Sequence, residues 1–203
     1  MQDFFERVID RWPAGRKDYH WHALASVEWV RNELYEPYEE LIHRPNLVPV
    51  QPENFHVTLL HGPPVEEVSE REVESMVAEV RAGCAGRTPF DLVLDRPALG
   101  SVAIECAGRP GAASRPLWQL TADATAKATG GRFPTIPAAH YPHASLAYAV
   151  GEVDRLPLKV WLSDHGRDPV TMRVDTISLV AQWHDRREII FDRILDVPLY
   201  GKR

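Results

Sequence analysis

The chain has 203 residues, of which 44% are hydrophobic and 26% are charged, as in an ordinary globular protein with a substantial core. Its net charge of −6 at pH 7 argues against a protein that coats nucleic acid non-specifically, because such binding depends on many contacts from Lys and Arg to phosphates. The two cysteines, Cys84 and Cys106, are too few for a disulfide framework or a thiolate zinc site and favour a reducing compartment.

The first residues have neither the basic start nor the apolar core of a signal peptide, and no uncharged apolar run is long enough to span a membrane. We therefore expect a cytoplasmic protein with no membrane partner. Residues 1–18 place Phe4, Phe5 and Val8 among charged residues, which predicts a short amphipathic helical extension packed on the body of the protein. A helix that binds a partner protein is the alternative. Residues 19–203 are expected to form one domain.

The rest of the chain predicts alternating strands and helices. In chain order we expect a strand at 19–25, a helix at 27–41, a proline-containing linker at 45–53, a first motif strand within 54–62, a helix at 69–82 ended by Gly83, strands at 90–94 and 101–106 joined by a turn at 97–100, a helix at 117–128, a linker at 132–142, a second motif strand at 143–148, a short helix at 156–162, and a long hairpin of strands 170–183 and 188–197.

The first motif strand carries His56 and Thr58 between apolar residues and is followed by Gly-Pro-Pro. Side chains alternate faces along a strand, so His56 and Thr58 project to one side while Val57 and Leu59 project to the other. The arrangement recurs in the second motif strand with His143 and Ser145. His-x-Ser/Thr triplets also arise by chance, but both copies lie in strand-like apolar runs, follow turn residues and precede a leucine. The pair therefore indicates one site built from two halves.

These two segments resemble the signatures of the two-histidine (2H) phosphoesterases, which include 2′-5′ RNA ligase-like proteins and cyclic phosphodiesterases. The matching stretches are 53–60 and 142–146, and a looser likeness extends from about residue 19 to about residue 199. Ser145 stands where threonine is commoner in the family and still supplies a hydroxyl. The resemblance implies two lobes whose motif strands face each other across a cleft, and an RNA-derived phosphoester as the substrate.

The order of elements independently suggests the same architecture. Strand, helix, motif strand, helix and strand occur in each half, as two repeats of pattern at about 19–95 and 101–197. This predicts a pseudo-symmetric α+β protein with two antiparallel sheets and helices outside, and the resemblance implies that the sheets face a central cleft.

Two imidazoles, one neutral and one protonated near neutral pH, can act as base and acid on a phosphodiester without a metal or cofactor. His56 and His143 are the expected catalytic pair, with no assignment of which is the acid, and Thr58 and Ser145 are expected to hydrogen-bond the phosphoryl oxygens. We expect a monomer that hydrolyses a 2′,3′-cyclic phosphate or related nucleotide or RNA-end phosphoester, with 2′-5′ RNA ligation as a possible side activity. A non-catalytic nucleotide or RNA-end binding module is the alternative.

Other polar residues are candidate neighbours of this site. His22 is expected near the cleft, and Tyr141 could stack on a base because it adjoins the second motif. For His20 the sequence does not decide between the cleft and a structural place at the sheet edge. The His20-x-His22 pair also suggests a metal site, but no Glu or Asp follows at a suitable interval, so no metal is expected. Four histidines are expected to be solvated in turns, namely His61, His140, His165 and His184. Four arginines are also expected to be solvated, namely Arg132, Arg173, Arg186 and Arg187, with the steering of an anionic substrate as the alternative.

Overall fold

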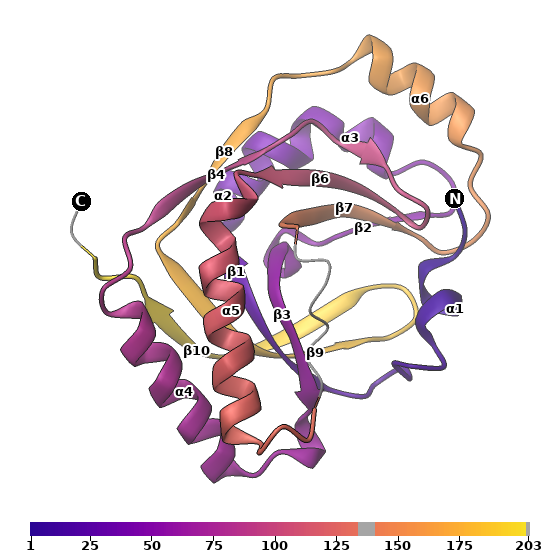
Figure 1. Cartoon of the computed structure of the whole chain (residues 1–203). Coiled ribbons are helices and arrows are strands. Elements are labelled where there is room, and N and C mark those ends of the chain that lie inside the picture. The colour runs from indigo at the N-terminus through magenta and orange to yellow at the C-terminus, as the bar shows by residue number, and fades with distance from the viewer. Residues whose placement is uncertain (134–140, 202–203) are drawn as a thin grey trace.

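The structure, a computed structural model, describes residues 1–133 and 141–201. It contains two antiparallel sheets (Figure 1), one with the strand order β10-β9-β1-β3 and the other with the order β2-β7-β6-β4-β8, where β5 pairs with β6. The strands are β1 (Asp18–Leu24), β2 (Leu47–Pro49), β3 (His56–Pro64), β4 (Phe90–Leu94), β5 (Ala98–Leu99), β6 (Ala103–Arg109), β7 (His143–Ala149), β8 (Val170–Val174), β9 (Thr176–His184) and β10 (Ile189–Pro198).

The helices are α1 (Phe4–Val8), α2 (Val27–Val30), the π-helical turn η1 (Arg31–Tyr35), α3 (Glu36–Ile42), the 3₁₀ turns η2 (Pro52–Asn54) and η3 (Val65–Glu67), α4 (Glu70–Cys84), α5 (Gly111–Ala128) and α6 (Arg155–Asp164). Helices α4 and α5 cover the outer face of the first sheet, helices α2, α3 and α6 pack on the second sheet, and α1 lies beside the cavity between the sheets. The antiparallel α+β architecture predicted from the order of elements is thus confirmed. Within the described residues, no helix combines the length and the apolar character needed to cross a bilayer.

Helices α4 and α5 lie side by side (Figure 1) against the outer face of the first sheet. α4 begins with a capping box in which Ser69 and Glu72 satisfy each other's backbone amides. The helix does not end at Gly83 as expected but continues through it. A Cβ at Gly83 would lie 2.4 Å from a methyl carbon of Leu120, so this glycine allows α4 and α5 to approach closely.

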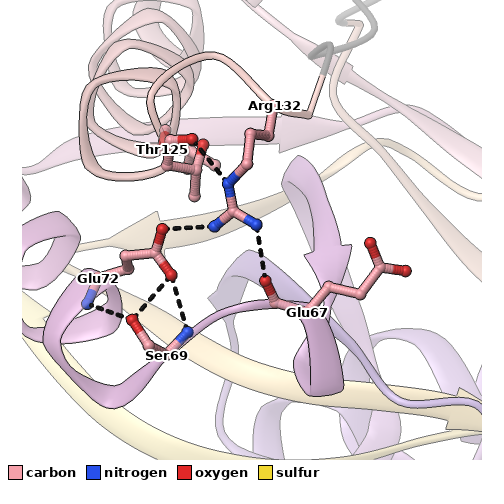
Figure 2. A network of polar contacts seen from close by, with 6 residues as sticks. Glu67, Ser69, Glu72, Thr125 and Arg132 are labelled. Carbon is pink, nitrogen blue, oxygen red and sulfur yellow. Dashed lines mark hydrogen bonds and ion pairs between the residues drawn. The ribbon is translucent and has the colours of Figure 1, made fainter.

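The start of α4 and the end of α5 are also joined by the network in Figure 2. Arg132 forms an ion pair with Glu72 and donates to the backbone carbonyls of Thr129 and Glu67, at 3.1 and 3.2 Å. Hydrogen bonds from Ser69, followed by the contact with Arg132, lower the pKa of Glu72 to about 2. Arg132 is exposed, as expected, and it also joins the two helices.

The second sheet packs on α2, α3 and α6, and its core includes Leu34, Leu41, Ile104, Leu146 and Met172. Several boundaries differ from expectation here. The linker expected at 45–53 contains the short strand β2, which pairs with β7, and β5 lies in the expected turn at 97–100. Most of the linker expected at 132–142 lies outside the described residues, and so does His140.

The strand expected at 170–183 is two strands in different sheets. β8 pairs with β4, whereas β9 pairs with β1 and β10, and the chain changes sheets at Asp175. The apolar positions are 170, 172 and 174 before Asp175 and 177, 179 and 181 after it. The alternation therefore changes phase at the break, and this is the sign of the break in the sequence. Because β9 and β10 complete the first sheet and β4 belongs to the second, each sheet contains strands from both halves of the chain.

Candidate active site

A cavity of about 530 Å³ lies between the two sheets. It is lined by His56 and Thr58 from β3 and by His143 and Ser145 from β7. The apolar residues between them, including Val57 and Ala144, are buried in the core. The alternation of each motif strand therefore turns both polar pairs toward the same space. A hollow of similar size, about 570 Å³, lies beside α3 and β8 and contains none of these four residues.

The two imidazoles are held in the same way. Nδ1 of His56 lies 2.7 Å from the backbone oxygen of Asn54, and Nδ1 of His143 lies 3.2 Å from that of Tyr141. A carbonyl oxygen can only accept a hydrogen bond, so each Nδ1 carries the proton. In a neutral ring the other nitrogen, Nε2, is then free to accept a proton.

Each motif strand contains a bulge immediately after its hydroxyl residue. The pairing of β1 with β3 passes from His22 opposite Thr58 to Trp21 opposite Leu60, which leaves Leu59 as an extra residue. The pairing of β6 with β7 passes from Glu105 opposite Ser145 to Ile104 opposite Ala147, which leaves Leu146 as the extra residue. The bulges return the third residue after each hydroxyl, His61 and Tyr148, to the cavity face.

His61 is exposed, as expected, but it lies on β3 and lines the cavity, whereas a turn was expected. Strict alternation places it on the face opposite His56, because the two residues are an odd number of positions apart. The repeated leucine after each hydroxyl residue coincides with the bulges, but a leucine in a strand has no feature that predicts one.

The surroundings of His56 are made of other rings. Its imidazole stacks on His22 at a centroid distance of 4.2 Å and an interplanar angle of 9°, and Phe191 meets it edge-on at 5.7 Å. Loss of water lowers the pKa of His56 to about 4, the hydrogen bond to Asn54 opposes this shift, and the charges of His143 and His61 reinforce it. His56 is thus neutral at physiological pH.

His22 and His20 form a buried layer behind His56. His22 is fully buried, so it lies behind the cavity wall, and His20 reaches the wall itself. Desolvation, followed by repulsion from neighbouring histidines, lowers the pKa of each ring well below its usual value. Neither ring nitrogen of His22 has a hydrogen-bond partner among the residues that the structure describes.

His143 has a carboxylate neighbour that its motif did not indicate. Nε2 of His143 lies 4.0 Å from a carboxylate oxygen of Glu105 on β6, and Glu105 is opposite Ser145 in the strand pairing. Tyr141 stacks on His143 at 4.8 Å and hydrogen-bonds Glu105. Tyr141 is half-exposed and is held beside the motif, although it is outside the lining of the cavity.

Tyr148 lies on the other side of Ser145. The two side chains are hydrogen-bonded, and burial raises the pKa of Tyr148 to about 12, so the phenol is protonated and can donate. Glu105 lies between Ile104 and Cys106, which are buried in the core, and this alternation is the signal that could have identified it. Tyr148 follows the bulge at Leu146, so strict alternation places it on the opposite face.

The N-terminal segment forms a further part of the wall. Phe4, Val8, Arg11 and Trp12 line the cavity together with residues of both sheets. His184, expected to be solvated, is instead fully buried, and its Nε2 donates to the backbone oxygen of Trp12 at 2.7 Å. Contacts between positions so distant in the chain leave no local pattern in the sequence.

The histidine-rich face of the first sheet does not have the geometry of a metal centre. Within residues 1–133 and 141–201, no three His, Cys, Asp or Glu side chains are grouped so that they could hold a metal ion. The stacked arrangement of His22 on His56 presents ring faces, not lone pairs, to one another.

No family model matches the chain, and no curated protein sequence matches it significantly. Solved structures with the same fold are found. E. coli LigT in complex with 3′-AMP has a TM-score of 0.68 at 18% identity, covering 91% of this chain and 98% of LigT. LigT in complex with NADP⁺ has a TM-score of 0.67 at 17% identity, covering 92% of this chain and 99% of LigT. The protein TT0787 of Thermus thermophilus has a TM-score of 0.71 at 19% identity, covering 92% of this chain and 100% of TT0787. The chain therefore has the LigT-like fold that its two motifs imply.

Proposed function

We propose that the protein is a metal-independent 2H phosphoesterase that hydrolyses nucleoside 2′,3′-cyclic phosphates or related RNA-end phosphoesters. The single observation that supports the proposal most strongly is that two histidines in matched settings line one cavity. His56 and His143 come from different sheets, each with Nδ1 on a backbone carbonyl and a hydroxyl residue two positions later. The nucleotide complexes of E. coli LigT, which shares the fold, support a nucleotide as the ligand.

The surroundings of the two histidines favour different roles. His56 is neutral because burial holds its pKa at about 4, so its Nε2 is free to accept a proton as a general base. His143 lies beside the negative charge of Glu105, which suits a general acid. In this scheme Nε2 of His56 takes a proton from water, and the water oxygen attacks phosphorus. The bond from phosphorus to one ribose oxygen breaks, and Nε2 of His143 gives its proton to that oxygen.

The hydroxyls of Thr58 and Ser145 are proposed to donate to the non-bridging phosphoryl oxygens as charge develops on them. Tyr148, hydrogen-bonded to Ser145, orients that hydroxyl. One chain supplies both motifs, so we propose that a monomer is active. The same two histidines would carry 2′-5′ ligation as a side activity, since the reverse reaction exchanges acid and base.

Single-site variants test the proposal. Replacing His56 or His143 by alanine should lower kcat/KM for a nucleoside 2′,3′-cyclic monophosphate by roughly 10⁴-fold, the upper end for a positioned acid or base. Thr58→Val and Ser145→Ala should each cost about 10²-fold, the effect of one lost donor. His43→Ala is the matched control, because His43 is an exposed histidine at the end of α3. Full activity in either histidine variant would contradict the mechanism.

The products and the binding affinity separate an enzyme from a binding module. Chromatography of the reaction identifies the nucleoside 2′- or 3′-monophosphate and hence the bond that is cut. Saturable binding of the cyclic phosphate by calorimetry with no product formed would instead favour a nucleotide or RNA-end binding module that uses the same cavity.

A further inference from the structure

The N-terminal segment, defined here as residues 1–17, is a fixed wall that joins the two sheets. On the side of the second sheet, the Gln2 amide donates to the Ser101 carbonyl and Arg7 donates to the Ser101 hydroxyl, both at 2.9 Å. On the side of the first sheet, His184 donates to the Trp12 carbonyl at 2.7 Å, and the Gly15 amide donates to the His184 carbonyl at 2.9 Å. The segment therefore closes one end of the cleft between the sheets.

Apolar packing fixes this wall further. Phe5 of α1 is buried in a cluster with Val50, Ala103, Tyr148 and Ile189, which brings together α1, the second sheet and β10 of the first. The Phe4 ring lies 4.7 Å from the Tyr148 ring. Side chains that project from the segment into the cavity thus have defined positions relative to the two motifs.

Arg11 is a cation of this wall that has no partner among the described residues. The other arginine that lines the cavity, Arg16, donates to both carboxylate oxygens of Asp18 at 2.9 and 2.7 Å. Among the described residues the Arg11 guanidinium has neither an ion pair nor a hydrogen bond, and its side chain is exposed to the cavity. Of the acidic groups in the lining, Asp18 is engaged by Arg16 and Glu105 lies beside His143. The charge of Arg11 is therefore available to an anionic ligand.

Arg11 lies at the end of the cavity away from His56. The neighbouring Trp12 ring faces His20 at 6.2 Å, and the His20 ring lies 4.7 Å from that of His61, five positions beyond His56 on β3. Part of the His61 ring stays open to the cavity, yet its pKa is lowered, first by loss of water and then by the positive charges of His143 and Arg11. Arg11 is not among the charges that shift the pKa of His56.

We infer that Arg11 binds a second phosphate group of the substrate, one that does not react, while Phe4 and Trp12 form the apolar surface beside it. This inference rests on the proposed function and specifies its substrate class. The guanidinium fork matches phosphate oxygens in a two-point contact, and aromatic faces accept a base or sugar without sequence preference. The preferred substrate is thus a 2′,3′-cyclic phosphate that also carries a 5′-phosphate or an internucleotide phosphate.

The test compares three substrates with the same base: the nucleoside 2′,3′-cyclic monophosphate, its 5′-phosphorylated form, and a dinucleotide ending in the cyclic phosphate. Wild type should prefer the second or third over the first in kcat/KM by about 10- to 100-fold, the range for hydrogen bonds to a charged group. A higher kcat/KM with both phosphorylated substrates would mean that the site accepts either kind of second phosphate. A higher kcat/KM with the 5′-phosphorylated substrate alone would mean that it requires a terminal phosphate. Arg11→Gln should abolish the preference, and Arg11→Lys should restore part of it.

Arg7→Gln is the matched control, because it removes the same charge from the same segment at a side chain that bonds Ser101 outside the cavity. It should keep the wild-type preference. No preference in wild type, or the same preference in wild type and Arg11→Gln, would overturn the inference.

A binding measurement separates this inference from the proposed function. Nucleoside 3′,5′-bisphosphate should bind wild type more tightly than nucleoside 3′-monophosphate by calorimetry, and Arg11→Gln should remove the difference. That result without turnover of any substrate would support the second phosphate site and contradict the hydrolase. Equal binding of both ligands by wild type would overturn the role of Arg11.

Discussion

His56 and His143 occupy matched positions in their strands but differ in their neighbours. His56 has a buried ring stacked on it and no carboxylate among the charges that shift its pKa, whereas His143 has Glu105 at 4.0 Å. Two imidazoles of identical chemistry therefore have different electrostatic surroundings. This difference, and not the order of the motifs in the chain, is the basis for assigning base and acid.

The pKa of His56 predicts the acid limit of activity. A general base must be unprotonated, so kcat/KM should be retained as the pH falls from 7 to 5 and should reach half its maximum near pH 4, where His56 takes up a proton. The measurement is kcat/KM between about pH 3.5 and 7, with circular dichroism at each pH to confirm that the protein is folded. A half-maximal point near 6.5, the ordinary pKa of histidine, would contradict the assignment of His56 as the buried neutral base.

At the scale of elements, the two motif strands could be predicted from sequence and their bulges could not. Alternation correctly indicated that His56, Thr58, His143 and Ser145 face one side, because a strand has a period of two residues. A bulge inserts one residue, so the residues after it face the opposite side from the one that strict alternation predicts. His61 was placed wrongly for this reason, and the site was predicted only up to the residue before each bulge.

The end of β3 was also predicted too early. Gly62 and the two prolines after it suggest a turn, yet the strand continues to Pro64. The reason for the glycine is the close approach of β1, because a Cβ at Gly62 would lie 2.4 Å from the Tyr19 carbonyl oxygen.

Gly62→Ala should therefore force β1 and β3 apart and destabilise the protein by about 1 to 3 kcal/mol, the usual cost of overpacking. Thermal or urea unfolding measures the change. Gly86→Ala is the control, because no atom lies within 4 Å of a Cβ at that position, and it should change the free energy of unfolding by less than about 0.5 kcal/mol. Equal stability of the two variants would contradict the close packing at Gly62.

At the scale of the whole molecule, the cavity is assembled from segments that are far apart in the chain. The α+β class and the pairing of two lobes follow from the order of elements. The exchange of β4, β9 and β10 between the sheets and the contact of Trp12 with His184 depend on tertiary packing, which no local pattern encodes. Arg11 was missed for the same reason, since the sequence places it in a surface extension.

The buried histidines make the stability of the whole fold depend on pH. His20, His22 and His56 have lowered pKa values in the folded state, whereas in the unfolded chain they titrate near 6.5. The unfolded state thus binds more protons as the pH falls below 6.5, so the free energy of unfolding should decrease from pH 7 to 5. Each histidine contributes up to about 1.4 kcal/mol per pH unit.

Urea unfolding at about pH 7.0 and 5.5 measures this dependence. His22→Phe keeps a ring against His56 and removes one titrating group, so its stability should change less between the two pH values than that of wild type. His43→Phe, at an exposed position, should retain the wild-type dependence. An identical pH dependence in wild type and His22→Phe would show that His22 is not held neutral in the folded protein.

In the proposed function, two histidines from facing sheets hydrolyse a phosphoester without a metal. The most direct measurement is turnover of a panel of nucleoside 2′,3′-cyclic monophosphates in the presence of EDTA, by wild type and by the His56→Ala/His143→Ala double variant. We predict turnover by wild type that EDTA does not reduce and that is absent in the folded double variant. Turnover that EDTA abolishes, or that survives in the double variant, would contradict metal-free catalysis by the two histidines.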